Sequence, residues 1–143
     1  MILPALSVRQ PWASMIASGR KTIETRVWGV SWRGPLAIVS SKFPDRNFEE
    51  AQTSGLPYGR ALCVVDVVAS RPMTEADEQA ACCEVYPRAM AWVFGDLWPL
   101  VHFPVTGNLG IYAIEIFPAH VMGGQVAYDA IAARTNDDWR PKQ

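Results

Sequence analysis

The sequence predicts an α+β fold dominated by strands, a small mixed or antiparallel β-barrel with short helices at its periphery. Two observations support this prediction. Apolar and β-branched runs of strand length recur along the chain, whereas the helical patterns are few and short. The helical patterns also do not alternate regularly with the strands, as a doubly wound parallel sheet would require. With 143 residues, of which 50% are hydrophobic, the chain suffices for one domain with a buried core.

The first half of the sequence is expected to contain most of the strands and two short helices. Pro11 suits the first turn of a helix, and Gly19 is the expected residue just after the end of that helix. A charged stretch over residues 44–53 suits a second helix. Strands are expected at residues 3–8, 21–28, 36–39 and 60–69, and the last of these has the strongest β-branched pattern in the chain.

The second half is expected to add three extended segments and two helices. Thr74 and Asp77 have the spacing of a capping box and predict a helix over residues 74–84. A last helix is predicted over residues 125–133. Extended segments are expected at residues 90–94, 98–105 and 111–116, the second of them despite Pro99 and Pro104.

Composition narrows the classes of function. The formal net charge is -1, so any nucleic-acid contact must be local rather than spread over a basic surface. Cysteine occurs only at positions 63, 82 and 83, without a CxxC motif or a histidine cluster, which argues against a disulfide framework and a zinc site. The N-terminus lacks the features of a signal peptide, and no apolar run approaches the ~20 residues that span a bilayer. We therefore expect a cytoplasmic protein without metal, cofactor or membrane contact.

The most informative segment runs from Gly19 to Arg26 and carries Lys21, Glu24 and Arg26 within a β-branched run. Charges so close together on a strand face water, pair with each other or line a pocket. Strand alternation places Glu24 and Arg26 on one face, and Ile23 and Val27 on the opposite face, which is the expected core face. Lys21 has the wrong parity to join Glu24, so a site here requires a bulge or an irregular start of the strand.

If the three charged groups meet, the carboxylate is neutralised and held between an ammonium and a guanidinium group. Such a cluster suits recognition of a nucleobase. A tryptophan stacked on the base would contribute ~1–3 kcal/mol to the binding free energy. The alternative is a structural salt bridge that closes the rim of a barrel. Arg9 either supports the site or covers the end of the barrel. The candidate ligand-binding residues are Gln10, Trp12, Lys21, Glu24, Arg26, Ser40, Lys42 and Trp92.

The stretch LSVRQPWASMIASGRKTIETR resembles the ASCH family, a branch of the PUA-like superfold. The family signature Gly-x-Lys-x-x-Glu-x-Arg is met by Gly19, Lys21, Glu24 and Arg26. Weaker similarity lies at residues 33–42, 91–94 and 104–107, so the resemblance covers about residues 3–117. It implies a PUA-like, five- or six-stranded mixed barrel with a cleft beside the signature. Residues 1–118 would then form the ASCH domain, and residues 119–143 a helical extension packed on it or trailing from it.

The resemblance also implies two classes of function. PUA-like domains commonly bind RNA or modified bases, which gives our first hypothesis. The alternative is a hydrolase that deacylates N(4)-acetylcytidine or cleaves RNA, with Lys21 stabilising an oxyanion and Glu24 acting as general base. In the amidohydrolase branch, the position that aligns with Glu24 looks like a threonine nucleophile. Because this chain has Glu24 there, acyl transfer through that threonine is not expected. The sequence makes no prediction of the oligomeric state.

Overall fold

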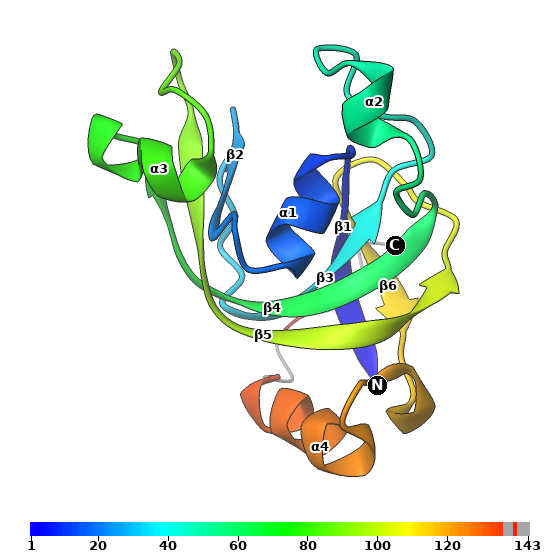
Figure 1. Ribbon diagram of the computed structural model, residues 1–143. Coiled ribbons are helices and arrows are strands. Elements are labelled where there is room, and N and C mark those ends of the chain that lie inside the picture. The colour runs from blue at the N-terminus through cyan, green and yellow to red at the C-terminus, as the bar shows by residue number, and fades with distance from the viewer. Residues whose placement is uncertain (136–138, 140–143) are drawn as a thin grey trace.

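A computed structural model describes residues 1–135 and 139, and its centre is one curved sheet of six strands (Figure 1). The strand order is β2-β5-β4-β3-β1-β6, with β1 and β3 parallel and the other neighbours antiparallel. The curved sheet forms a half-barrel, so the prediction of a mainly β, mixed, six-stranded fold is confirmed. The strands are β1 Ile2–Val8, β2 Ile23–Arg26, β3 Gly34–Ser40, β4 Arg60–Pro72, β5 Met90–Pro104 and β6 Ile111–Glu115.

Short helices lie on both sides of the sheet. The helix α1 lies inside the curve of the sheet, and α4 lies on the outer side (Figure 1). The helical segments are α1 Trp12–Ala17, α2 Glu50–Thr53, η1 Glu75–Asp77, α3 Glu78–Ala81, η2 Pro118–His120 and α4 Gly124–Arg134. In the described part of the chain, none of these helices has the length and apolar character needed to cross a bilayer.

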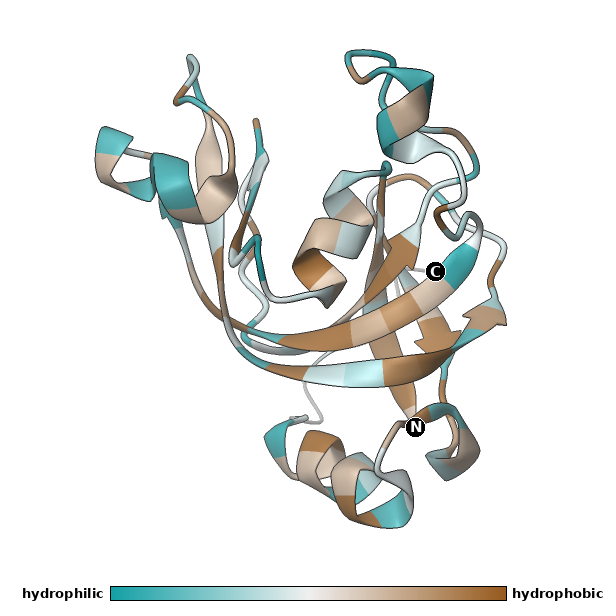
Figure 2. Cartoon of the chain, viewed as in Figure 1, coloured by the Kyte–Doolittle hydropathy of each residue, from teal (hydrophilic) through white to brown (hydrophobic). Residues whose placement is uncertain are grey.

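Two groups of buried side chains stabilise the two faces of the sheet, whose strands carry most of the hydrophobic residues (Figure 2). Inside the curve, Ile16 of α1 packs with Leu36, Ile38 and Trp92. On the outer side, Val121 and Ile131 are buried with residues of β1, β3 and β6. The described residues after 118 therefore pack on the sheet, while the domain boundary at that point stays a prediction.

Three predicted elements differ from those observed. Segments 90–94 and 98–105 form the single strand β5, because shifts in its register with β4 accommodate the chain around Pro99. The helix predicted over 74–84 is the shorter pair η1 and α3, which ends where Cys82 adopts a left-handed φ of 58°. The second strand starts at Ile23 and ends at Arg26, and Val27 is exposed rather than part of the core.

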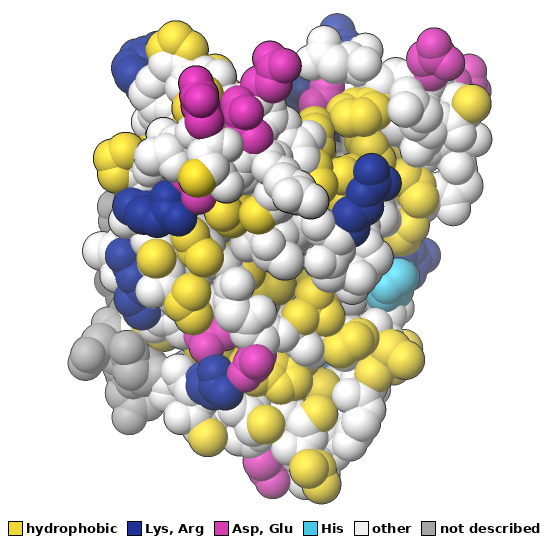
Figure 3. Space-filling view, turned by 60° about the vertical axis from the view of Figure 1, so that its left-hand side comes forward, with side chains coloured by type: hydrophobic (Ala, Val, Ile, Leu, Met, Phe, Trp, Pro, Cys, Tyr) yellow, Lys and Arg dark blue, Asp and Glu magenta, His cyan; other side chains and the backbone are white. Residues whose placement is uncertain are grey.

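The charged side chains on the face shown in Figure 3 are scattered among apolar and neutral ones. Basic groups lie beside acidic groups there, and no broad basic area forms on this face. This distribution agrees with the net charge of -1.

Candidate functional site

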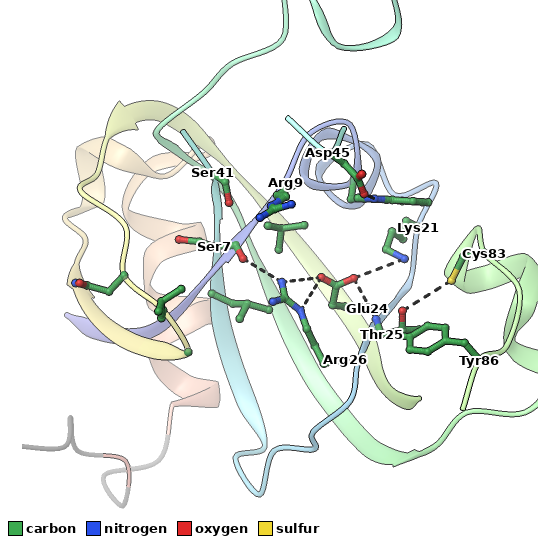
Figure 4. A pocket seen from close by; sticks show the side chains of 16 residues that line it. Ser7, Arg9, Lys21, Glu24, Thr25, Arg26, Ser41, Asp45, Cys83 and Tyr86 are labelled. Carbon is green, nitrogen blue, oxygen red and sulfur yellow. Dashed lines mark hydrogen bonds and ion pairs between the residues drawn. The ribbon is translucent and has the colours of Figure 1, made fainter. Parts of the chain in front are cut away.

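A cavity of about 520 Å³ lies where β1 and β2 face each other across the open side of the half-barrel. We call it the charged cavity, and Figure 4 shows its lining side chains. Between β1 and β2 the described residues form a single hydrogen bond, from Arg26 Nη2 to the carbonyl oxygen of Ser7 at 3.0 Å. The gap between the strands is therefore bridged by a side chain. The lining residues are Leu6, Ser7, Val8, Arg9, Trp12, Lys21, Glu24, Thr25, Arg26, Ser41, Asp45, Cys83, Tyr86, Asn108, Leu109 and Gly110.

Lys21 points into this cavity although its parity in the sequence is wrong for a strand. It precedes the first residue of β2, so strand alternation does not apply to it. Its ammonium group lies 3.7 Å from Glu24 Oε1 and 4.8 Å from the centre of the Trp12 ring. It also donates a hydrogen bond to the carbonyl oxygen of Ala81, at the end of α3. With 2% of its side chain exposed, Lys21 is surrounded by these three electron-rich groups.

Glu24 lies between the two cations, and both of its carboxylate oxygens already accept hydrogen bonds or pair with a cation. Oε1 faces Lys21 and accepts from the backbone N–H of Thr25 at 3.1 Å. Oε2 accepts from Arg26 Nε at 3.3 Å and from Nη2 at 3.1 Å. Charge-assisted, forked contacts of this kind fix a carboxylate in position. Three hydrogen bonds and the ion pair with Lys21 thus hold the Glu24 carboxylate in one orientation.

Arg26 carries the donors that remain available in the cluster. Its side chain is 29% exposed, and among the described residues its Nη1 group has no hydrogen-bond acceptor. Two cations around one carboxylate leave one positive charge in the cluster. The cluster thus presents a positive, hydrogen-bond-donating wall to a ligand.

Trp12, which lies against Lys21, is held in place by Asp45, whose carboxylate accepts from the indole Nε1–H at 2.9 Å. The backbone N–H of Asn47, followed by this indole N–H, lowers the pKa of Asp45 from its ordinary value. The edge of Trp12 also meets Phe48, with the ring centres 5.1 Å apart. These contacts leave the indole little freedom to reorient.

Gln10 and Trp92, two of the predicted ligand-binding residues, do not line the cavity. Gln10 is fully buried, and its amide exchanges hydrogen bonds with Ser14 and donates to the carbonyl oxygen of Pro57 at 2.8 Å. Trp92 is fully buried beneath Trp28 and donates to the backbone of that residue at 3.0 Å. In this structure both side chains support the fold, and their predicted role in binding a ligand stays a prediction.

Ser40 and Lys42 lie in a neighbouring cavity of about 690 Å³, which we call the serine cavity. Ser40 is almost fully buried, and its hydroxyl group bonds the backbone of Arg60 at 3.2 and 3.3 Å. Lys42 is exposed. The serine cavity is lined by Ser7, Ser40, Ser41, Lys42, Gly59, Val105, Thr106, Gly107, Asn108 and Leu109.

Several lining residues of the charged cavity were not candidates in the sequence. Cys83 and Tyr86 follow α3, and Cys83 Sγ lies 3.8 Å from Thr25 Oγ1. Tyr86 is 37% exposed and supplies an aromatic ring beside the charged cluster. Neither residue belongs to a periodic pattern, so only the path of the chain after α3 brings them here. Arg9, which the sequence left open, lines the cavity.

A metal centre is not indicated in the described part of the chain, where no group of three or more His, Cys, Asp or Glu side chains has a suitable arrangement.

The fold is that of solved ASCH proteins. The crystal structure of ASCH from Zymomonas mobilis is 15% identical, with 98% of this chain and 82% of that chain aligned at a TM-score of 0.49. A point mutant of that protein is 11% identical, with 92% and 96% aligned at a TM-score of 0.50. None of the curated proteins matches the sequence.

The family model for the ASCH domain matches residues 6–101, which include the charged cluster. The chain therefore belongs to the ASCH domain family, a family associated with RNA binding.

Proposed function

We propose that this protein binds RNA or a modified nucleoside through the charged cavity. The observation that supports the proposal most is the cluster of Lys21, Glu24 and Arg26, which lines a cavity with aromatic side chains in its wall and leaves Arg26 Nη1 without an acceptor among the described residues. Such a wall suits the carbonyl groups and the ring face of a nucleobase.

Binding is favoured over hydrolysis by the state of the same groups. A general base needs a free lone pair directed at its target, and hydrogen bonds from Thr25 and Arg26 occupy three of the roughly four lone-pair sites of the Glu24 carboxylate. Lys21 is likewise surrounded by Ala81, Glu24 and Trp12. The cluster is thus arranged as a fixed receptor.

The test is a calorimetric titration with cytidine, N(4)-acetylcytidine and a short single-stranded RNA. We expect wild-type protein to bind at least one of them, and Glu24→Gln to weaken that binding, because the neutral amide releases the two cations from their fixed positions. Glu115→Gln on the exposed edge of β6 removes the same charge outside both cavities and should bind like wild type. Equal affinity of Glu24→Gln and wild type for every ligand would contradict the proposal.

The alternative function is deacylation of N(4)-acetylcytidine or cleavage of RNA by the same cavity, with Lys21 and Glu24 as the catalytic residues. It requires Glu24 to exchange a present partner for a water molecule. Chromatography of both substrates after incubation with the protein separates the alternatives, with Lys21→Ala as the control. We expect no product, and a product formed by wild type but not by Lys21→Ala would replace binding by hydrolysis.

A further inference from the structure

The charged cavity and the serine cavity adjoin, because they share the lining residues Ser7, Ser41, Asn108 and Leu109. Two of these residues belong to residues 107–110, which we call the ridge loop. A ligand that leaves one cavity toward the other must therefore pass the ridge loop.

The ridge loop approaches β1 closely at Gly107, while the side chain of Leu109 is exposed to solvent. A Cβ atom at Gly107 would lie 2.7 Å from Ser7 Oγ, so any other residue there would require the Ser7 side chain to move. Gly110 has a φ of +66°, which also favours glycine. Between them Leu109 is 99% exposed, although it lines both cavities. An apolar side chain is thus presented to solvent at the boundary between two hollows.

The walls on either side of Leu109 suit an anion. Lys42 lies in the serine cavity, whose lining contains no acidic residue. In the charged cavity, Arg9 lies near enough to Asp45 to lower the pKa of that carboxyl, but it forms no hydrogen bond or salt bridge among the described residues, and the hydroxyl group of Ser41 forms no hydrogen bond among them. A phosphodiester near Ser41 would meet a cation from each cavity.

We infer that Leu109 is a wedge that separates two consecutive nucleotides of single-stranded RNA, with one base in the charged cavity and the next in the serine cavity. The phosphodiester between them lies near Ser41, within reach of Arg9 and Lys42. Apolar side chains inserted between neighbouring bases unstack them in the same way at other nucleic-acid sites. This inference rests on the proposed function, because it names the ligand of the same site and extends that site into the serine cavity.

The experiment uses dinucleotides of cytidine and 2-aminopurine riboside, whose fluorescence is quenched by stacking. Both sequence isomers are titrated, because strand polarity decides which isomer places 2-aminopurine in the serine cavity. The lining of that cavity includes no aromatic side chain. We therefore expect the fluorescence of one isomer to rise when it binds wild-type protein.

Leu109→Ala removes the wedge without removing a buried contact. We expect it to abolish most of the fluorescence rise and to weaken dinucleotide binding about tenfold, and to weaken binding of cytidine alone by a smaller factor, because cytidine meets Leu109 only at the edge of the charged cavity. Val126→Ala, an 81% exposed position on α4, is the matched control and should leave all three quantities unchanged.

Lys42→Ala tests the phosphate contact. It should weaken binding of the dinucleotide but not of cytidine, and lower the slope of log K against log salt concentration by ~0.7, the value for one phosphate contact on a single strand. Arg20→Ala removes an exposed cation from a different cavity, on the far side of Trp12, and should bind like wild type.

The outcomes separate this inference from the proposed function. Wild-type binding of cytidine with no gain in affinity for either dinucleotide would overturn the wedge and leave the proposed nucleoside site standing. An unchanged fluorescence rise in Leu109→Ala would also overturn the wedge. Absence of binding to both dinucleotides would overturn the wedge, and absence of binding to cytidine, N(4)-acetylcytidine and the short RNA as well would overturn the proposed function with it.

Discussion

Glu24 keeps two cations in place inside a cavity of limited solvent access. Its side chain is 7% exposed, and Lys21 and Arg26 approach it from opposite sides. Removing one partner of a buried ion pair leaves the other charge without compensation. The resulting loss of folding stability is larger than the stability that the intact pair contributed. The Glu24 carboxylate therefore both stabilises the fold and fixes the positions of the two cations in the site.

Glu24→Ala is predicted to lower the free energy of unfolding by roughly 3–5 kcal/mol, because the Lys21 ammonium group stays buried without its carboxylate. Glu24→Gln should cost clearly less, since an amide oxygen still accepts a hydrogen bond. Urea denaturation of both variants beside wild type measures the difference. Equal stability of the two variants would mean that charge compensation at this position is not what stabilises the cluster.

Tyr86 is predicted to stack on the base in the charged cavity, because its ring lines the wall and is partly exposed. Tyr86→Ala should weaken binding of the nucleoside by about 1 kcal/mol or more. Tyr86→Phe keeps the ring and should retain most of the affinity. Calorimetric titration distinguishes the two, and similar losses in both variants would assign the effect to the hydroxyl group instead.

At the scale of elements, α3 connects the outer part of the half-barrel to the charged cluster. Its last residue, Ala81, accepts the hydrogen bond of Lys21. The segment before it is fixed by Asp77, which accepts from both guanidinium nitrogens of Arg71 at 2.7 and 2.9 Å and from the backbone N–H of Thr74. Contacts around η1 thus help to position a residue of the cavity.

The Arg71 guanidinium and the Thr74 N–H lower the pKa of Asp77 from 3.8 to about 2. This carboxylate therefore contributes stability that is fully present above pH 3.8 and is lost as the pH falls toward 2. Because Arg71 is half-exposed, we expect Asp77→Asn to cost about 1 kcal/mol at neutral pH. The difference from wild type should shrink on acidification below pH 3.8 and nearly vanish below pH 2.

Urea denaturation from pH 7 to pH 2 tests this prediction, with Asp129→Asn on the exposed face of α4 as the control. A difference between Asp77→Asn and wild type that does not change over this range would show that the ion pair contributes no pH-dependent stability.

The elements that could be predicted are those with a clear hydrophobic pattern within their own sequence. β3 and β4 are continuous apolar runs, and burial on both faces made them recognisable. The sequence predicts two extended segments in place of β5, because Pro99 and Pro104 interrupt its pattern. Only the pairing with β4 shows that the segments form one strand. The contact of Lys21 with Glu24 could only be stated as a requirement of the site, because Lys21 is also held by Ala81, 60 residues away. Tyr86 carries no local signal at all.

At the scale of the whole molecule, the positive groups around the site are few. The net charge is -1, and the face in Figure 3 shows no broad basic area. If the proposed function holds, affinity for RNA is expected to come from the two cavities and not from general attraction to the phosphate backbone.

The salt dependence of binding to a short single-stranded RNA is therefore predicted to be shallow. The slope of log K against log salt concentration should lie between about -0.7 and -2, as for one to three phosphate contacts on a single strand. Titrations over a series of potassium chloride concentrations measure it. A much steeper slope would reveal a footprint that extends well beyond the two cavities.

The bond from Arg26 to the carbonyl oxygen of Ser7 has a consequence for how this fold diversifies. Where two strands are joined by a backbone ladder, their spacing is the same in every protein. Here a side chain bridges the gap between β1 and β2, and no backbone pairing among the described residues does so. Exchange of that one residue can therefore open the bridge without shifting the register of any strand.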